Sequence, residues 1–182
     1  MAETTGAQTE RSRIVTGLFR DRDSAERAYG SLSGRGYGKD DVNLMMSDDT
    51  RKKYFAEDKN AGHTDLGDKA WEDAGKGAAI GAGTGATIAA LAAIGTTLAI
   101  PGLNLLVAGP LAAALLGAGA GGLTGGLIGA LVGHGVPEER AKEYDRGVRE
   151  GGILMGVNAR SDEDADYLAD EFRTNRGESV YR

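Results

Sequence analysis

Glycine recurs at every fourth position in one uncharged stretch of the chain. The stretch "GAGAGGLTGGLIGALVG" covers residues 117–133 and places glycine at 117, 121, 125, 129 and 133. Side chains four residues apart share one face of a helix, so these glycines would form a stripe of bare backbone. Each helical glycine costs about 1 kcal/mol relative to alanine, so such a helix needs a closely packed partner. The spacing therefore predicts a helix-packing surface made by Gly117, Gly121, Gly125, Gly129 and Gly133.

A second stripe with the same spacing lies earlier in the chain, at Gly77, Gly81 and Gly85. No Asp, Glu, Lys or Arg occurs between Gly77 and Pro137. We predict two apolar helices over 77–100 and 110–133, joined through a short tip, as a glycine-zipper hairpin within 77–134. A helix of this length measures roughly 36 Å, enough to cross a hydrocarbon core of about 30 Å. Small residues at such spacing let helix backbones approach closely, within one hairpin or between chains.

The flanks of this apolar region contain the same strand-helix-strand pattern twice. We predict strands at 13–20 and 41–47 around a helix at 21–32, and strands at 152–160 and 179–182 around a helix at 161–172. The second strand alternates Val42, Leu44 and Met46, as a half-buried strand does. Ser161 and Asp164 resemble a capping box. Each helix has one apolar face at i, i+3, i+4, i+7 spacing: Ala25, Ala28, Tyr29 and Leu32 in the first, and Ala165, Leu168, Ala169 and Phe172 in the second.

Two such units predict an α+β fold, a ferredoxin-like sandwich with a four-stranded antiparallel sheet and both helices on one face. The expected organisation is a polar tail at 1–12 and one discontinuous domain formed by 13–47 and 152–182. Between its second and third strands lies a long insertion. The insertion comprises a polar linker with some helix at 48–76, the apolar hairpin at 77–134 and a charged helix at 135–151.

Composition excludes several kinds of protein. The chain has 21 Lys and Arg against 27 Asp and Glu, a net charge of −6, and no basic cluster that would track phosphates, so no nucleic-acid partner is expected. Without cysteine it has no disulfides, thiolate metal sites or cysteine nucleophiles. The segment "MAETTGAQTERSR" lacks the apolar core of a secretory signal, so we expect a cytoplasmic protein.

Three patterns resemble reactive or metal-binding motifs, and each has a plainer explanation. Gly117, Gly119 and Gly122 spell GxGxxG, but inside an uncharged predicted helix rather than after a strand. The spacing of Asp162, Asp164 and Asp166 resembles a calcium loop, but its sixth and twelfth positions are Tyr167 and Arg173, so acids at a helix start explain it better. The histidines, His63 and His134, have no companion ligands. We therefore expect no catalytic residues, no metal, no cofactor and no enzyme.

Two non-enzymatic hypotheses remain. In the favoured one, the hairpin inserts into the inner face of the cytoplasmic membrane, with the folded domain in the cytoplasm. In the other, hairpins from several chains bury one another in a water-soluble homo-oligomer or filament. The partners are thus other copies of the chain or a lipid bilayer, and a small-ligand or partner-binding regulatory module is a further alternative. The membrane hypothesis predicts five residues at the interface: Lys69, Trp71, Lys76, Arg140 and Lys142.

The order of these segments resembles the bacterial general stress protein 17M-like family. The resemblance covers "IVTGLFRDRDSAERAYGSLSGRGYGKDDVNLMMSDD" and residues 135–160, and "PEERAKEYDRGVREGG" is its most specific part. It also includes the glycine-rich apolar middle. The resemblance implies a bacterial protein induced by heat, cold, osmotic or similar stress. It supplies no catalytic residues.

Overall fold

The computed structural model describes residues 13–38, 40–55, 96–100, 103–109 and 119–182. These residues form an α+β fold built on one antiparallel sheet, which confirms the predicted fold class. The sheet order is β3-β4-β2-β5-β1-β6. The strands are β1 (Ile14–Phe19), β2 (Val42–Ser47), β3 (Thr96–Ile100), β4 (Leu103–Ala108), β5 (Ile153–Asn158) and β6 (Glu178–Tyr181). The helices described are α1 (Arg22–Gly34), α2 (Asp48–Phe55), α6 (Gly119–Gly133), α7 (Glu138–Arg149) and α8 (Asp162–Thr174).

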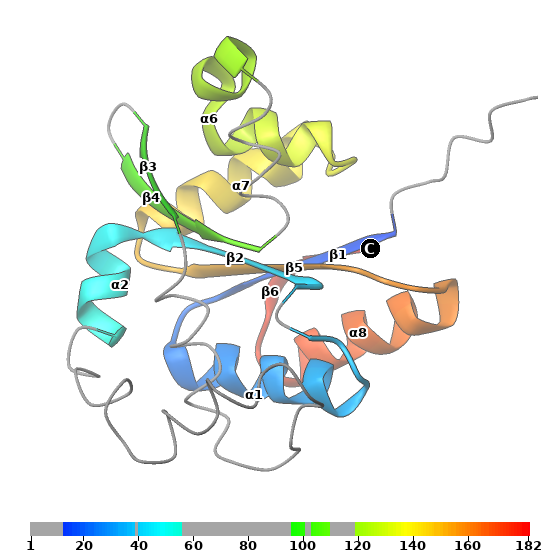
Figure 1. The fold of residues 1–182 in the computed structure, drawn as a ribbon. Helices are drawn as coiled ribbons and strands as arrows, with labels where there is room; N and C mark the ends of the chain where they lie inside the picture. Colours follow the sequence, from blue (N-terminus) through cyan, green and yellow to red (C-terminus); the bar gives the residue numbers. More distant parts are fainter. Residues whose placement is uncertain (1–12, 39, 56–95, 101–102, 110–118) are drawn as a thin grey trace, which may run out of the picture.

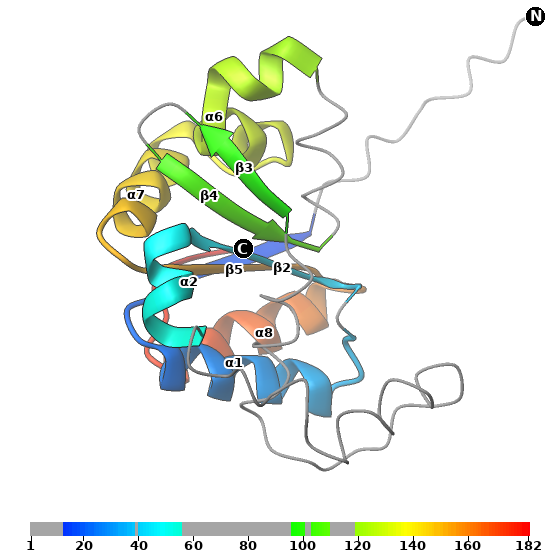
Figure 2. The ribbon, with the colours of Figure 1, turned by 60° about the vertical axis from the view of Figure 1, so that its left-hand side comes forward.

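Helices cover both faces of the sheet, so the structure has three layers (Figures 1 and 2). On one face lie α1 and α8, whose buried residues include all eight apolar positions predicted from the sequence. Phe19 and Phe172 meet there edge to face, with ring centroids 5.4 Å apart. On the other face lie α6 and α7, which bury Leu18, Met45 and Leu154. Both sides of the sheet are therefore core.

The central strands do not alternate between buried and exposed positions as predicted for 41–47. All six residues of β2 are buried, including Met45 and Asn43 as well as Val42, Leu44 and Met46. The alternation predicts one solvent-exposed face, but the α6–α7 layer buries that face too. Because Asn43 is buried, its amide needs a partner, and Nδ2 donates to the Gly156 carbonyl at 3.4 Å.

The helices of the two repeated units begin at side-chain caps. The Asp21 carboxylate accepts from Ser24 N–H at 2.8 Å, and the Ser161 hydroxyl accepts from Asp164 N–H at 3.0 Å. The second bond is the first half of the predicted capping box, whereas the Asp164 carboxylate accepts from Arg35 and Tyr37. Pro137 precedes α7 and fixes its entry, without a side-chain cap.

Four helices end in the same arrangement of backbone hydrogen bonds. After α1, α6 and α7, a glycine with positive φ follows the helix (Gly36, Gly135 and Gly151), and the next N–H bonds five residues back. This is the Schellman motif, which favours glycine because its left-handed residue has no Cβ clash. After α8 the same position is Arg176, with φ of 64°.

Two parts of the predicted hairpin are wrong. Residues 96–100, expected at the end of the first helix, form β3, and 103–108, expected as the tip, form β4, which pairs with β2 (Leu44 opposite Ala108). The sheet therefore has six strands where four were predicted. Threonine, valine and isoleucine in these segments favour strand, and β4 forms backbone hydrogen bonds with β2 on one side and with β3 on the other.

The second apolar helix is helical over 119–133, as α6, but it is not one straight rod. Gly126 has φ of 56° and ψ of −151°, which interrupts α6 in its middle. In the described part of the chain no helix combines the length and the apolar character needed to cross a bilayer. The stretch 77–95 and residues 110–118 of the predicted hairpin lie outside the described residues.

Candidate functional site: the outer face of α6

The second half of α6 is anchored in the core by two leucines. Leu127 and Leu131 are buried in the apolar cluster on the α6–α7 side of the sheet, which also contains Leu105 and Val107 of β4. The Schellman turn after α6 brings Val136 into the same cluster, because Val136 N–H donates to the Leu131 carbonyl at 3.0 Å. These contacts fix which side of α6 faces inward.

The opposite side of α6 is apolar and exposed. Gly129 and Gly133 are exposed, and among the described residues no atom lies within 4 Å of a Cβ placed on either. Val132, between them, is 42% exposed and is the large hydrophobic side chain left in solvent in the described part of the chain. A helix that is largely apolar around its circumference and has no charged residue, as α6 does, is normally buried on every side. The outer face of α6, which we define as Gly129, Val132 and Gly133, therefore lacks cover among the described residues.

The other predicted packing glycines fall in three places. Gly121 and Gly125 belong to the first half of α6, before the interruption at Gly126. Gly77, Gly81, Gly85 and Gly117 lie outside the described residues. The structure thus brings two of the eight, Gly129 and Gly133, to a surface that a partner helix could contact.

The predicted membrane-interface residues are only partly described. Arg140 and Lys142 lie on α7, where Arg140 pairs with Glu143 at 2.7 Å and Lys142 with Glu138 at 2.8 Å. Such exposed pairs within one helix contribute little and leave both cations at the surface. Lys69, Trp71 and Lys76 lie outside the described residues.

The three aspartates with calcium-like spacing do not converge. Asp164 accepts from Arg35 Nε and from Tyr37 OH, each at 2.9 Å, and the Arg35 guanidinium holds the pKa of Asp164 below its usual value. Asp162 pairs with Arg13 at 2.9 Å, and Asp166 pairs with Arg182. Each carboxylate faces a different arginine, and no group of three His, Cys, Asp or Glu in the described residues is arranged to hold a metal ion.

The glycine fingerprint and the histidine also have structural explanations. Gly119 and Gly122 lie in α6, as described from Gly119 onward, and Gly117 lies outside the described residues. The preceding strand, β4, ends at Ala108 and is antiparallel to both neighbours, whereas the dinucleotide fingerprint belongs to a parallel βαβ unit. His134 Nδ1 lies 3.0 Å from the Ala130 carbonyl, a contact that ties the ring to its own helix. His63 lies outside the described residues.

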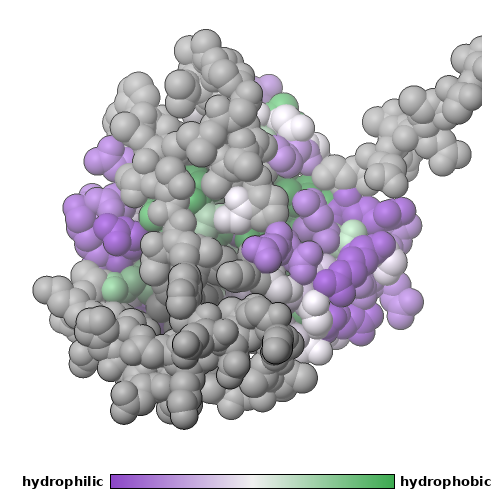
Figure 3. Space-filling model, in the orientation of Figure 1, coloured by the Kyte–Doolittle hydropathy of each residue, from purple (hydrophilic) through white to green (hydrophobic). Residues whose placement is uncertain are grey.

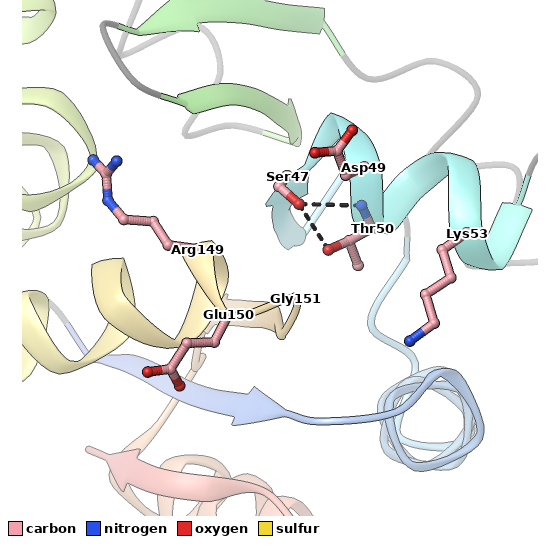
Figure 4. A pocket seen from close by; sticks show the side chains of 7 residues that line it. All are labelled: Ser47, Asp49, Thr50, Lys53, Arg149, Glu150 and Gly151. Atoms are coloured by element: carbon pink, nitrogen blue, oxygen red, sulfur yellow. Dashed lines mark hydrogen bonds between the residues drawn. The ribbon is translucent and has the colours of Figure 1, made fainter.

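A shallow hollow of about 440 Å³ lies where α2 meets the end of α7 (Figure 4). Ser47 and Thr50 meet there through their hydroxyls at 2.8 Å, opposite Gly151. The charged side chains that line it, Asp49, Lys53, Arg149 and Glu150, point in different directions rather than toward one centre. Glu150 instead pairs with Arg20 at 2.9 Å. The hollow thus lacks the convergent polar groups that orient a bound molecule.

The surface also separates polar from apolar regions. Figure 3 shows hydrophilic residues gathered on the side where α8 lies, and apolar residues at the level of the sheet.

Comparisons of the chain with protein-family models, with curated proteins and with solved structures found no match.

Proposed function

We propose that this chain is a non-enzymatic, self-associating protein of the bacterial stress response, and that its insertion supplies the contact surface. The observation that carries the proposal is the outer face of α6. Its exposed Val132 and two open glycines would be covered by another helix at close approach, as small residues allow. Covering exposed apolar surface is also the main source of favourable free energy in association.

The body of the protein is then a ferredoxin-like sandwich that carries this surface. The strands of the two repeated units are adjacent in the order β2-β5-β1-β6, and both of their helices lie on one face. That order supports the finer fold assignment. The insertion adds two strands and a second helical layer to it.

The stress-response part of the proposal has a different basis, the resemblance of residues 14–49 and 135–160 to the general stress family. A lipid bilayer at the inner membrane face is the alternative cover for the outer face of α6. Its two glycines favour a helix as the cover, because they offer a bilayer little apolar side-chain area.

The test is a double substitution, Gly129→Leu with Gly133→Leu. A Cβ at either position has no described atom within 4 Å, and both positions are exposed, so the fold should be retained. Contact with a partner helix should fail, because overpacking costs about 1 to 3 kcal/mol per site. Light scattering after size exclusion should show a shift from oligomer to monomer.

Gly34→Leu is the matched control. Gly34 ends α1, lies equally open and is on the other side of the sheet, so this variant should keep the oligomer. An unchanged oligomer in the double variant would refute the α6 contact. A wild-type protein that is monomeric in buffer but floats with lipid vesicles would replace self-association with the bilayer alternative.

A further inference from the structure

Strand β6 forms an edge of the described sheet and pairs irregularly with β1. Its four residues are exposed or half-buried, whereas all six residues of β1 are buried. Thr16 is opposite Tyr181, and Leu18 is opposite Glu178. Two residues of β6 therefore lie opposite Gly17 alone, which makes a β-bulge and interrupts the ladder of backbone hydrogen bonds. Short, partly exposed strands of this kind are the segments that open locally.

The bulge holds Ser179 in a left-handed conformation. Its φ is 52°, which brings Cβ close to the following carbonyl oxygen and is normally left to glycine. Glycine is also the usual residue where a bulge contains a left-handed position. Ser179 thus adopts a conformation that its own side chain disfavours, so other contacts must stabilise it while β6 is in the sheet.

A buried hydroxyl from α7 supplies such a contact. Tyr144 OH donates to the Ser179 carbonyl at 2.6 Å, and its oxygen lies 2.9 Å from the Thr16 hydroxyl. The phenol has one proton, so donation to Ser179 leaves the Thr16 hydroxyl to donate to Tyr144. Tyr144 and Thr16 are both fully buried. One chain of hydrogen bonds therefore joins β1, α7 and β6 away from water.

A second tyrosine makes a connection in the opposite direction. Tyr181 of β6 donates its OH to the Gly135 carbonyl at 3.3 Å. Gly135 is the left-handed residue of the turn between α6 and α7. Strand β6 is thus bonded both to α7 and to the turn that leads into it.

The ion pairs around β6 are weaker anchors. Glu178 pairs with Arg20 at 2.8 Å, and Arg182, which follows β6, pairs with Asp166 of α8. All four of these residues are exposed, and exposed pairs contribute little to stability. Loss of a partner costs more for buried polar groups, so the attachment of β6 depends most on Tyr144.

We propose that β6 is a releasable strap on the edge of β1, and that α7 controls its release through Tyr144. In the attached state Tyr144 holds the bulge at Ser179. In the released state β6 leaves β1, and Ser179 relaxes to an ordinary conformation. Coupling between two elements is reciprocal, so displacement of α7 releases β6 and detachment of β6 loosens α7. Release also uncovers the edge of β1. This device does not depend on the proposed self-association.

The experiment is hydrogen–deuterium exchange of the full chain, followed by mass spectrometry of peptides from β6, α7 and β5. Tyr144→Phe keeps the ring and removes the hydroxyl. We expect exchange in β6 to become about tenfold faster, because the Ser179 carbonyl loses its donor, while β5 is unchanged. Tyr29→Phe is the matched control, since Tyr29 is a similarly buried tyrosine on α1, on the other face of the sheet. Exchange in β6 should be unaffected by it.

A second variant tests the coupling from the other direction and leaves Tyr144 intact. Val180 of β6 packs against the core on the α1–α8 face. Val180→Asp should detach β6, because a charge in that position loses its hydration. We then expect several-fold faster exchange in α7 around Tyr144, again with β5 unchanged.

Three outcomes would overturn the proposal. Unchanged exchange of β6 in Tyr144→Phe would show that this hydroxyl does not hold the strand. Equal acceleration in β5 and β6 would indicate unfolding of the whole domain rather than release of a strap. Faster exchange of β6 in Val180→Asp without any change in α7 would show that β6 frays independently of α7.

Discussion

Two helical glycines in neighbouring helices offer a matched test of the packing described above. Gly129 in α6 and Gly147 in α7 both gain about 0.5 to 1 kcal/mol of helix propensity when replaced by alanine. Their surroundings differ. A Cβ at Gly129 meets nothing within 4 Å among the described residues, whereas a Cβ at Gly147 would lie 2.2 Å from Leu18 Cδ2.

Leu18 cannot move aside easily. It is buried, its Cδ2, Cδ1 and Cγ all lie within 3.2 Å of the new Cβ, and its Cδ1 also lies 2.9 Å from the position that a Cβ on Gly152 would take. We expect overpacking to cost about 1 to 3 kcal/mol at Gly147. Because the propensity gain cancels between the variants, Gly147→Ala should be less stable than Gly129→Ala by that same amount.

Urea denaturation followed by circular dichroism measures the difference. With a slope of about 2 kcal/mol per molar urea, the two midpoints should differ by roughly 0.5 to 1.5 M. The measurement is repeated over a range of protein concentration, since association would shift both curves. Adding Leu18→Ala should remove most of the Gly147→Ala penalty, a non-additive effect expected of residues in contact. Equal midpoints for the two glycine variants would refute the close approach of α7 to β1.

Three further outcomes follow from single residues. Arg176→Gly should raise the free energy of unfolding by about 0.5 to 1 kcal/mol, measured in denaturant. The substitution removes the steric cost of a non-glycine residue at positive φ, and the greater entropy of glycine in the unfolded chain offsets part of this gain. Unchanged or lower stability would contradict the prediction. Burial raises the pKa of Tyr144 from 10.0 to about 12. The stability that this shift contributes is complete below pH 10 and is lost as the pH rises toward 12. Titration of phenolate absorbance in the wild type and in Tyr144→Phe would detect the raised pKa. The hydrogen bond from Ser24 N–H lowers the pKa of Asp21. Asp21→Ala should therefore lower the free energy of unfolding by roughly 1 kcal/mol at neutral pH, and this difference should disappear as the pH falls through the pKa of Asp21, as denaturation at both pH values would show.

The repeated units were predictable because local signals agreed with tertiary packing. The faces ending at Leu32 and Phe172 have clear helical spacing, and caps at Asp21 and Ser161 mark where each helix starts. Because short strands directly precede and follow each helix in the sequence, few arrangements of the four strands in one sheet were possible. What the alternation of Val42, Leu44 and Met46 could not reveal is that a second helical layer buries Met45 on the opposite face.

The insertion was harder to predict because its residues show no alternation of charged and apolar positions. With no charged residue between Gly77 and Pro137, an apolar run reads equally well as a buried helix or as a buried strand. Thr96, Thr97 and Val107 were the available strand signals, and β4 is stabilised by pairing with β2, which is distant in sequence. The exposed side of α6 was foreseeable in part, because glycines at four-residue spacing, such as Gly129 and Gly133, share one face of a helix.

The pairing of β2 with β5 joins residues separated by the whole insertion, as with Val42 opposite Val157. Closing a loop of roughly 100 residues costs about 2 to 3 kcal/mol more than closing a short hairpin, and it slows folding. During synthesis, at about 5 to 20 residues per second, β1, α1 and β2 would emerge roughly 5 to 20 seconds before β5. Over that interval the first unit lacks the strand that separates β1 from β2, and its apolar surfaces are open to chaperones or to other nascent chains.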